Sequence, residues 1–184
     1  MIKGKLFIVS GPSGAGKSTI TKKILREVEN IYLTVSATTR NPRKGEVNGQ
    51  EYYFYSKEEF EKGIKKDDFL EYALVHDNYY GTLKSEVTQR LELGQNVLLE
   101  IDVQGGGQVK EIFEDAISIF IKAPSIEELQ KRLNGRATDS EEVIQKRLKN
   151  SIKELTYEEK YDYTIINGEF EKAYQELKKI ITEV

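Results

Sequence analysis

The sequence predicts an α/β protein built on a mainly parallel sheet. Short apolar runs alternate with amphipathic stretches along most of the chain, which is the pattern of strands that alternate with helices. The length of 184 residues corresponds to about one domain. With 38% hydrophobic and 32% charged residues, the composition is that of an ordinary globular protein.

Apolar runs predict the buried strands of this sheet, and helical spacing of apolar residues predicts the helices between them. The strands are expected at residues 6–10, 32–36, 96–101, 117–121 and 163–166. The helices are expected at residues 18–28, 126–133, 141–155 and 170–181. Ser125 and Glu128 fit a capping box at the start of one helix.

Two segments interrupt this pattern and are predicted to be insertions. In the first, between Thr38 and Thr82, aromatic-rich runs at 52–55 and 69–75 surround a small helix at 57–66, which Ser56 and Glu59 open. We expect a short antiparallel sheet there. The second insertion is rich in arginine and extends from about residue 125 to 147.

Composition excludes several classes of function. Lysine and arginine number 28 and aspartate and glutamate 31, a net charge of −3, so no excess of positive charge is available to bind nucleic acid or a membrane surface. The absence of cysteine excludes disulfides, thiol catalysis and cysteine–zinc sites, and the single histidine excludes a two-histidine metal motif. Without an apolar run of 18 residues or a signal-like leader, we expect a cytoplasmic location.

The most specific motif is Gly11-Pro-Ser-Gly-Ala-Gly-Lys-Ser18, which matches the P-loop pattern between a predicted strand and a predicted helix. The backbone N–H groups of this loop and the positive dipole end of the following helix are expected to bind phosphate oxygens. Lys17 is expected to reach the β- and γ-phosphates, and Ser18 to offer its hydroxyl to Mg²⁺. The residues expected to bind ATP are Gly11, Pro12, Ser13, Gly14, Ala15, Gly16, Lys17, Ser18 and Thr19.

The motif predicts a P-loop NTPase-type parallel sheet, but by itself it does not identify the reaction that the protein catalyses. An Asn-Lys-x-Asp motif, expected in a GTPase, is absent from the sequence, and motor or AAA-type ATPases are normally longer. A short chain with two polar insertions suggests a kinase for a small acceptor, with the insertions closing over the substrates.

A candidate acceptor site follows the second predicted strand. Arg40 and Arg43 flank a proline there, and two guanidinium groups so close together repel each other unless an anion lies between them. Tyr52 and Tyr80 could add hydroxyl donors to the same anion. The alternative is a solvated basic loop beside ordinary sheet aromatics.

Taken in order, these motifs resemble guanylate kinase over nearly the whole chain. The segments that carry the resemblance are residues 11–18, 36–43, 45–49 with Tyr52, 69–71, 78–82 and 101–105, followed by Arg132, Gly135-Arg136 and Arg147. The departures are the single Pro124, Gly106-Gly107 and Ala137, which lie beside matched positions.

The resemblance implies a small GMP-binding insertion at about 36–82, an arginine-rich lid at about 125–147, and a core from about 1–35, 83–124 and 148–184. It implies that Arg40, Arg43, Tyr52 and Tyr80 hold the GMP phosphate. It also implies that Ser36, Glu71, Thr82 and Asp102 read the guanine.

The chemistry of guanine agrees with a carboxylate at Glu71. Guanine presents N1–H and a 2-amino group to one carboxylate, whereas adenine would place an N1 lone pair against it. Asp102 keeps two interpretations: the strand-end aspartate that orients Mg²⁺ through water, or a residue near the guanine amino group.

Three arginines form the implied lid: Arg132, Arg136 and Arg147. By resemblance they close over the triphosphate and, with Lys17 and Arg40, act catalytically by neutralising the transferring phosphoryl group. The alternative is helix-terminal cations with a Glu128–Arg132 pair.

The implied reaction is ATP + GMP ⇌ ADP + GDP, with Mg²⁺ as cofactor, ATP as co-substrate and dGMP as a further acceptor. A phosphate monoester is largely dianionic at pH 7, so the attacking oxygen needs no general base, and His76 receives no role. Two rivals remain at this point: a non-catalytic guanylate-kinase-like module that binds proteins, and a kinase for another nucleotide or small metabolite.

Overall fold

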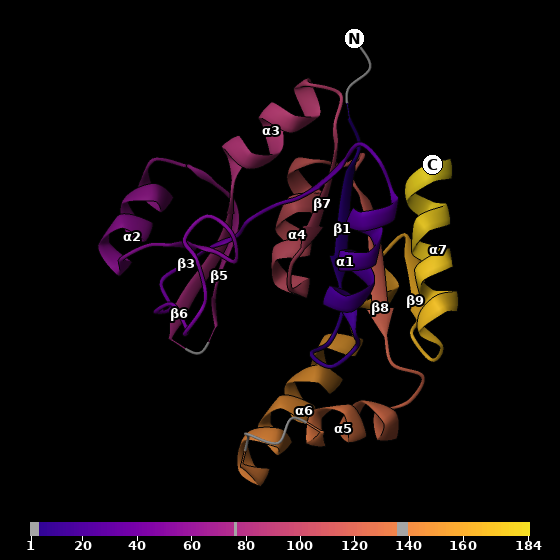
Figure 1. Ribbon diagram of the computed structural model, residues 1–184. Helices are drawn as coiled ribbons and strands as arrows, with labels where there is room; N and C mark the ends of the chain where they lie inside the picture. The colour runs from indigo at the N-terminus through magenta and orange to yellow at the C-terminus, as the bar shows by residue number, and fades with distance from the viewer. Residues whose placement is uncertain (1–3, 76, 136–139) are drawn as a thin grey trace. The chain divides into compact units, whose positions relative to one another are not determined.

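The computed structural model describes residues 4–75, 77–135 and 140–184 and has the predicted α/β architecture (Figure 1). Within these ranges the strands form a five-stranded sheet, in the order β2-β7-β1-β8-β9, and a four-stranded sheet, in the order β4-β3-β6-β5. The strands are β1 Leu6–Ser10, β2 Ile31–Leu33, β3 Ala37–Thr38, β4 Tyr53–Phe54, β5 Phe69–Val75, β6 Asn78–Leu83, β7 Asn96–Glu100, β8 Ile117–Lys122 and β9 Tyr163–Ile166.

Helices separate most of the strands. They are α1 Lys17–Glu27, α2 Lys57–Lys65, α3 Lys84–Glu92, α4 Val103–Ile112, α5 Ile126–Asn134, α6 Glu141–Leu155 and α7 Phe170–Glu183, with a 3₁₀ turn, η1, at Glu158–Lys160. The chain divides into two compact units. The first comprises the described residues within 1–6, 31–99 and 104–116, and the second those within 7–30, 100–103 and 117–184.

The second unit contains the larger part of the parallel sheet. β8 pairs in parallel with both β1 and β9. Every residue of β1 is buried, as expected for a strand covered on both faces. α1 packs against α7 and α5 against α6 (Figure 1). β1, at the centre of these contacts, leads directly into the loop that joins it to α1.

The first unit contains β2 and β7, paired in parallel, and the four-stranded sheet. The rings of Phe60 and Phe69 stack with centroids 4.2 Å apart, and they form the core beneath that sheet together with Ala37. The hydroxyls of Tyr32 and Tyr53 both donate to the Glu86 carboxylate, at 2.5 and 2.7 Å, so α3 is tied to β2 and β4.

The strands and helices agree closely with the sequence predictions, apart from a few differences. The second strand ends at Leu33 rather than at residue 36. α3 and α4 are helices that the sequence analysis did not identify, and α4 contains three consecutive glycines, which are poor helix formers. The small sheet is mixed rather than antiparallel, because β3 and β4 pair in parallel.

The two predicted helix caps have different outcomes. Ser56 and Glu59 form the complete capping box of α2. At α5, the Ser125 hydroxyl accepts from the Glu128 N–H at 3.1 Å, which is half of a box. The Glu128 carboxylate instead accepts from Nε of Arg132 at 3.1 Å.

Candidate active site

The loop between β1 and α1 has the geometry of an anion-binding loop. Gly14 and Gly16 have φ values of 86° and 88°, a left-handed conformation that favours glycine. A Cβ on Gly14 would lie 3.2 Å from the side chain of Leu133 and 3.3 Å from that of Leu129, so α5 packs directly on the loop. α1 begins at Lys17, which brings the positive end of its dipole to the loop.

The Lys17 ammonium lies against the start of this loop. Its Nζ donates to the carbonyl oxygens of Gly11, at 2.5 Å, and Pro12, at 3.0 Å. Burial raises the pKa of Glu154 above its ordinary value. Lys17 opposes this shift, and nearby Asp102 adds to it. Lys17, Asp102 and Glu154 therefore share one electrostatic environment. No motif in the sequence points to Glu154.

A carboxylate contacts the serine that was expected to bind Mg²⁺. The Ser18 hydroxyl donates to Glu100, and the Thr21 hydroxyl donates to the other carboxylate oxygen of Glu100 at 2.7 Å. Glu100 ends β7, two residues before the half-buried Asp102. The Asp102 carbonyl accepts from Oγ of Ser10 at 3.4 Å. Glu100 was not among the predicted site residues, although a charged residue at the end of a buried strand was a usable signal.

The chemistry of these donors fits Mg²⁺. The Ser18 hydroxyl and the Glu100 carboxylate are hard oxygen donors, and Mg²⁺ is commonly held by one or two carboxylates together with waters and substrate phosphates. Among the residues that the structure describes, no cluster of three or more histidine, aspartate or glutamate side chains could hold a metal by itself. A site completed by phosphate oxygens agrees with that donor set.

Two of the three arginines of the predicted lid lie within the described residues. Arg132, on α5, donates through Nη2 to the carbonyl oxygen of Asn167 at 2.8 Å. Arg147, on α6, is half-buried. Arg136 lies outside the described residues, as do Ala137 and His76.

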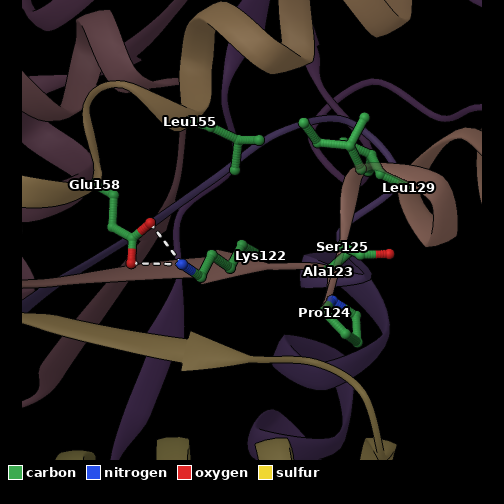
Figure 2. A pocket seen from close by; sticks show the side chains of 8 residues that line it. Lys122, Ala123, Pro124, Ser125, Leu129, Leu155 and Glu158 are labelled. Carbon is green, nitrogen blue, oxygen red and sulfur yellow. Dashed lines mark hydrogen bonds and ion pairs between the residues drawn. The ribbon is translucent and has the colours of Figure 1, made fainter.

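A small pocket of about 200 Å³ lies where β8 leads into α5 (Figure 2). Lys122 Nζ donates to both oxygens of Glu158, at 2.7 and 2.8 Å. Because Lys122 precedes α5 and Glu158 follows α6, this pair holds the two stems of the α5–α6 segment near each other (Figure 2). The pocket is lined by Lys122, Ala123, Pro124, Ser125, Ile126, Leu129, Leu155 and Glu158.

In the first unit, the predicted phosphate-binding residues gather around Arg40. The guanidinium lies 5.3 Å from the ring centroid of Tyr52, whose ring meets that of Tyr80 edge to face at 6.0 Å. Arg40 forms a bidentate pair with Glu46 at 2.9 and 3.0 Å, and the backbone N–H of Arg43 donates to the same carboxylate at 2.7 Å.

This pairing shifts the pKa of both partners toward the charged forms. The hydrogen bond from Arg40, followed by that from the Arg43 N–H, lowers the pKa of Glu46, and the bond to Glu46 raises the pKa of Arg40. Glu46 is therefore a carboxylate that holds the predicted phosphate-binding arginine in place. Glu46 lies in the segment 45–49 that contributes to the resemblance, but the sequence alone gave it no role.

The predicted guanine-reading residues include a buried pair. Glu71 on β5 and Thr82 on β6 are cross-strand neighbours, 5% and 0% exposed, and the Thr82 hydroxyl donates to the Glu71 carboxylate at 2.7 Å. A buried carboxylate that accepts from a hydroxyl is a strong and directional acceptor. Ser36 is half-buried directly before β3, and Asp102 belongs to the second unit.

The strand β1, the glycine-rich loop and α1 define a P-loop nucleotide-binding protein of the α/β class. The family model for guanylate kinase matches residues 3–184. The chain belongs to the guanylate kinase family.

Individual relatives agree with this assignment. The chain is 63% identical over 181 residues to a guanylate kinase of Fusobacterium nucleatum, covering 98% of this chain and 97% of that protein. It is 50% identical over 182 residues to a guanylate kinase of Clostridium tetani, covering 99% and 87%. The crystal structure of guanylate kinase from Anaplasma phagocytophilum superposes with a TM-score of 0.80 at 35% identity, covering 98% of this chain and 86% of that one.

Proposed function

We propose that this protein catalyses the reversible transfer of the γ-phosphoryl group of ATP to GMP, which yields ADP and GDP and serves purine nucleotide metabolism. The observation that carries the proposal is the buried Glu71–Thr82 pair in a chain that also has a P-loop. The P-loop accounts for the donor, and the pair accounts for a guanine acceptor.

The donor phosphates bind at residues 11–19. Two left-handed glycines and the start of α1 favour an anion there. Lys17 moves from the carbonyl oxygens of its own loop to the β- and γ-phosphates. Ser18 and Glu100 would hold Mg²⁺, with Asp102 acting through water, and the bound ion would neutralise phosphate charge.

Guanine binds through the first unit. The Glu71 carboxylate accepts from N1–H and the 2-amino group, and the Ser36 hydroxyl can donate to an acceptor atom of the ring. The Thr82 hydroxyl, which donates to Glu71, orients that carboxylate toward the base. Asp102 is a further candidate for the amino group. Because Glu71 is 5% exposed, water could not compensate for a mismatched base, which disfavours AMP.

The GMP phosphate binds at Arg40, Arg43, Tyr52 and Tyr80. Glu46 then has two effects. It orients the guanidinium of Arg40, and its negative charge disfavours binding of an anion there unless that anion, such as the dianionic GMP phosphate, can compete for the same guanidinium. The attacking phosphate oxygen carries its own charge near pH 7, so these residues need only position it.

The arginines of the α5–α6 segment, Arg132, Arg136 and Arg147, neutralise charge on the transferring group together with Lys17 and Arg40. This catalytic set contains cations alone. It therefore acts through electrostatic stabilisation rather than proton transfer.

ATP, GMP and dGMP are the proposed partners, with no nucleic acid or membrane, and the cytoplasm is the proposed location. Within the described ranges, no helix has the length and apolarity needed to cross a bilayer.

A nucleotide panel tests the proposed function. Purified protein is incubated with ATP, Mg²⁺ and one acceptor (GMP, dGMP, AMP, CMP or UMP), and ADP release is followed. Release with GMP well above that with AMP is expected. Equal rates with all acceptors would indicate a kinase of another specificity, and no ADP release together with no ATP binding would indicate a non-catalytic module.

A further inference from the structure

Asn167 is a buried polar residue that no P-loop motif includes. It follows β9 directly and is 7% exposed. Its backbone N–H donates to the carbonyl oxygen of Lys122, at the end of β8, at 2.7 Å. Its main chain is therefore fixed to the parallel sheet of the second unit.

The Asn167 side chain reaches the phosphate-binding loop. Its Nδ2 donates to the carbonyl oxygen of Ala15 at 2.8 Å in a buried hydrogen bond. A trans peptide points its C=O and N–H in opposite directions. Holding the Ala15 carbonyl toward Asn167 consequently turns the N–H of Gly16 away from it.

The side-chain amide of Asn167 lies tightly against Gly16. A Cβ at this position would lie 2.4 Å from Nδ2 of Asn167, so the amide occupies the space of a side chain. Ala15 is 0% exposed, and water could not replace the lost donor without movement of the loop.

The carbonyl of the same residue holds a lid arginine. The Asn167 carbonyl oxygen accepts from Nη2 of Arg132 at 2.8 Å, while Nε of that arginine donates to Glu128. Asn167 thus contacts both the Ala15–Gly16 peptide and the guanidinium of Arg132.

We propose that Asn167 is a positioning residue for the donor phosphates: its side-chain amide orients the Ala15–Gly16 peptide of the P-loop, and its carbonyl orients Arg132. The inference rests on the proposed phosphoryl transfer. Side-chain substitution removes the first interaction and leaves the second, which is made by the backbone.

Asn167→Leu and Asn167→Ala test this role. Leucine keeps the branched shape of asparagine without a donor, whereas alanine removes both shape and donor. We expect both variants to lower kcat/KM for ATP by about ten- to hundredfold. KM for GMP should stay within about twofold, since the acceptor residues of the first unit are untouched.

Ser151→Ala is the matched control, because Ser151 is also buried in the second unit, at 1% exposure, and lies outside the proposed machinery. It should behave like the wild type. A role in packing alone predicts a leucine variant close to wild type and a damaged alanine variant. That result, or equal losses for ATP and GMP, would overturn the inference.

A measurement on the wild type covers the case in which neither variant folds. NMR should find that the side-chain amide protons of Asn167 exchange with water much more slowly than those of the exposed Asn150. Equal exchange rates would overturn the inference. If the wild type fails to turn over ATP with GMP, the proposed function fails instead, and the exchange measurement still decides whether Asn167 holds the loop.

Discussion

Replacing Glu71 by glutamine isolates the charge that the account assigns to guanine recognition. The carboxylate is 5% exposed and accepts from Thr82 at 2.7 Å. Glutamine can keep an oxygen toward Thr82, but its other terminal atom becomes an amide donor. That donor would face the N–H donors of guanine.

The size of the effect follows from the loss of acceptors. A hydrogen bond to a charged group contributes about 1.5–3 kcal/mol, and the variant loses at least one while opposing two donors. We expect a loss of about 3 kcal/mol, or about a hundredfold in kcat/KM for GMP. The KM for ATP should be unchanged.

The assay is coupled ADP release with GMP varied at saturating ATP, then ATP varied at saturating GMP. Glu92→Gln, an exposed carboxylate of the same unit, is the control and should match the wild type. Equal losses for both nucleotides would mean that Glu71 is structural. An unchanged kcat/KM for GMP would refute the assignment of guanine to this carboxylate.

Three further substitutions test separate parts of the account. Lys17→Ala should lower kcat by at least about a hundredfold, about 2.7 kcal/mol, with an unchanged circular dichroism spectrum, and near-normal turnover would exclude Lys17 from the reaction. Glu100→Gln should raise the Mg²⁺ concentration that gives the half-maximal rate by about tenfold or more, while KM for GMP stays constant. An unchanged Mg²⁺ titration would mean that the Ser18–Glu100 contact has no part in metal binding. Burial, followed by the hydrogen bond to Glu86, raises the pKa of Tyr32 from 10.0 to about 12. The contribution of the protonated Tyr32 hydroxyl to the free energy of unfolding is therefore fully present below pH 10 and is lost as the pH rises through about 12. Urea unfolding of Tyr32→Phe should therefore depend less steeply on pH across this window than the wild type, and parallel curves would contradict that pKa.

Sequence reasoning succeeded where the signal is local. The P-loop is a contiguous motif, and the strand and helix beside it follow from hydrophobic spacing. The capping box of α2 lies within four consecutive residues. α4 was missed because its three consecutive glycines are poor helix formers, although Val103 and Val109 of this helix are buried.

Other site residues have partners that are distant in sequence, so spacing alone could not pair them with the P-loop. Glu100 contacts Ser18 across 82 positions, and Asn167 reaches Ala15 across 152. Neither belongs to a spacing pattern, so only the folded chain brings them to the loop. The roles assigned to the predicted nucleotide-binding residues stay predictions.

The path of a single phosphoryl group is the most direct test of the account. ATP labelled with ³²P at the γ-position is incubated with the protein, Mg²⁺ and GMP, and the products are separated. The account predicts label in the β-phosphate of GDP, and in ATP again when labelled GDP and ADP are supplied. Label released only as inorganic phosphate, or retained in ATP while GMP is present, would contradict it.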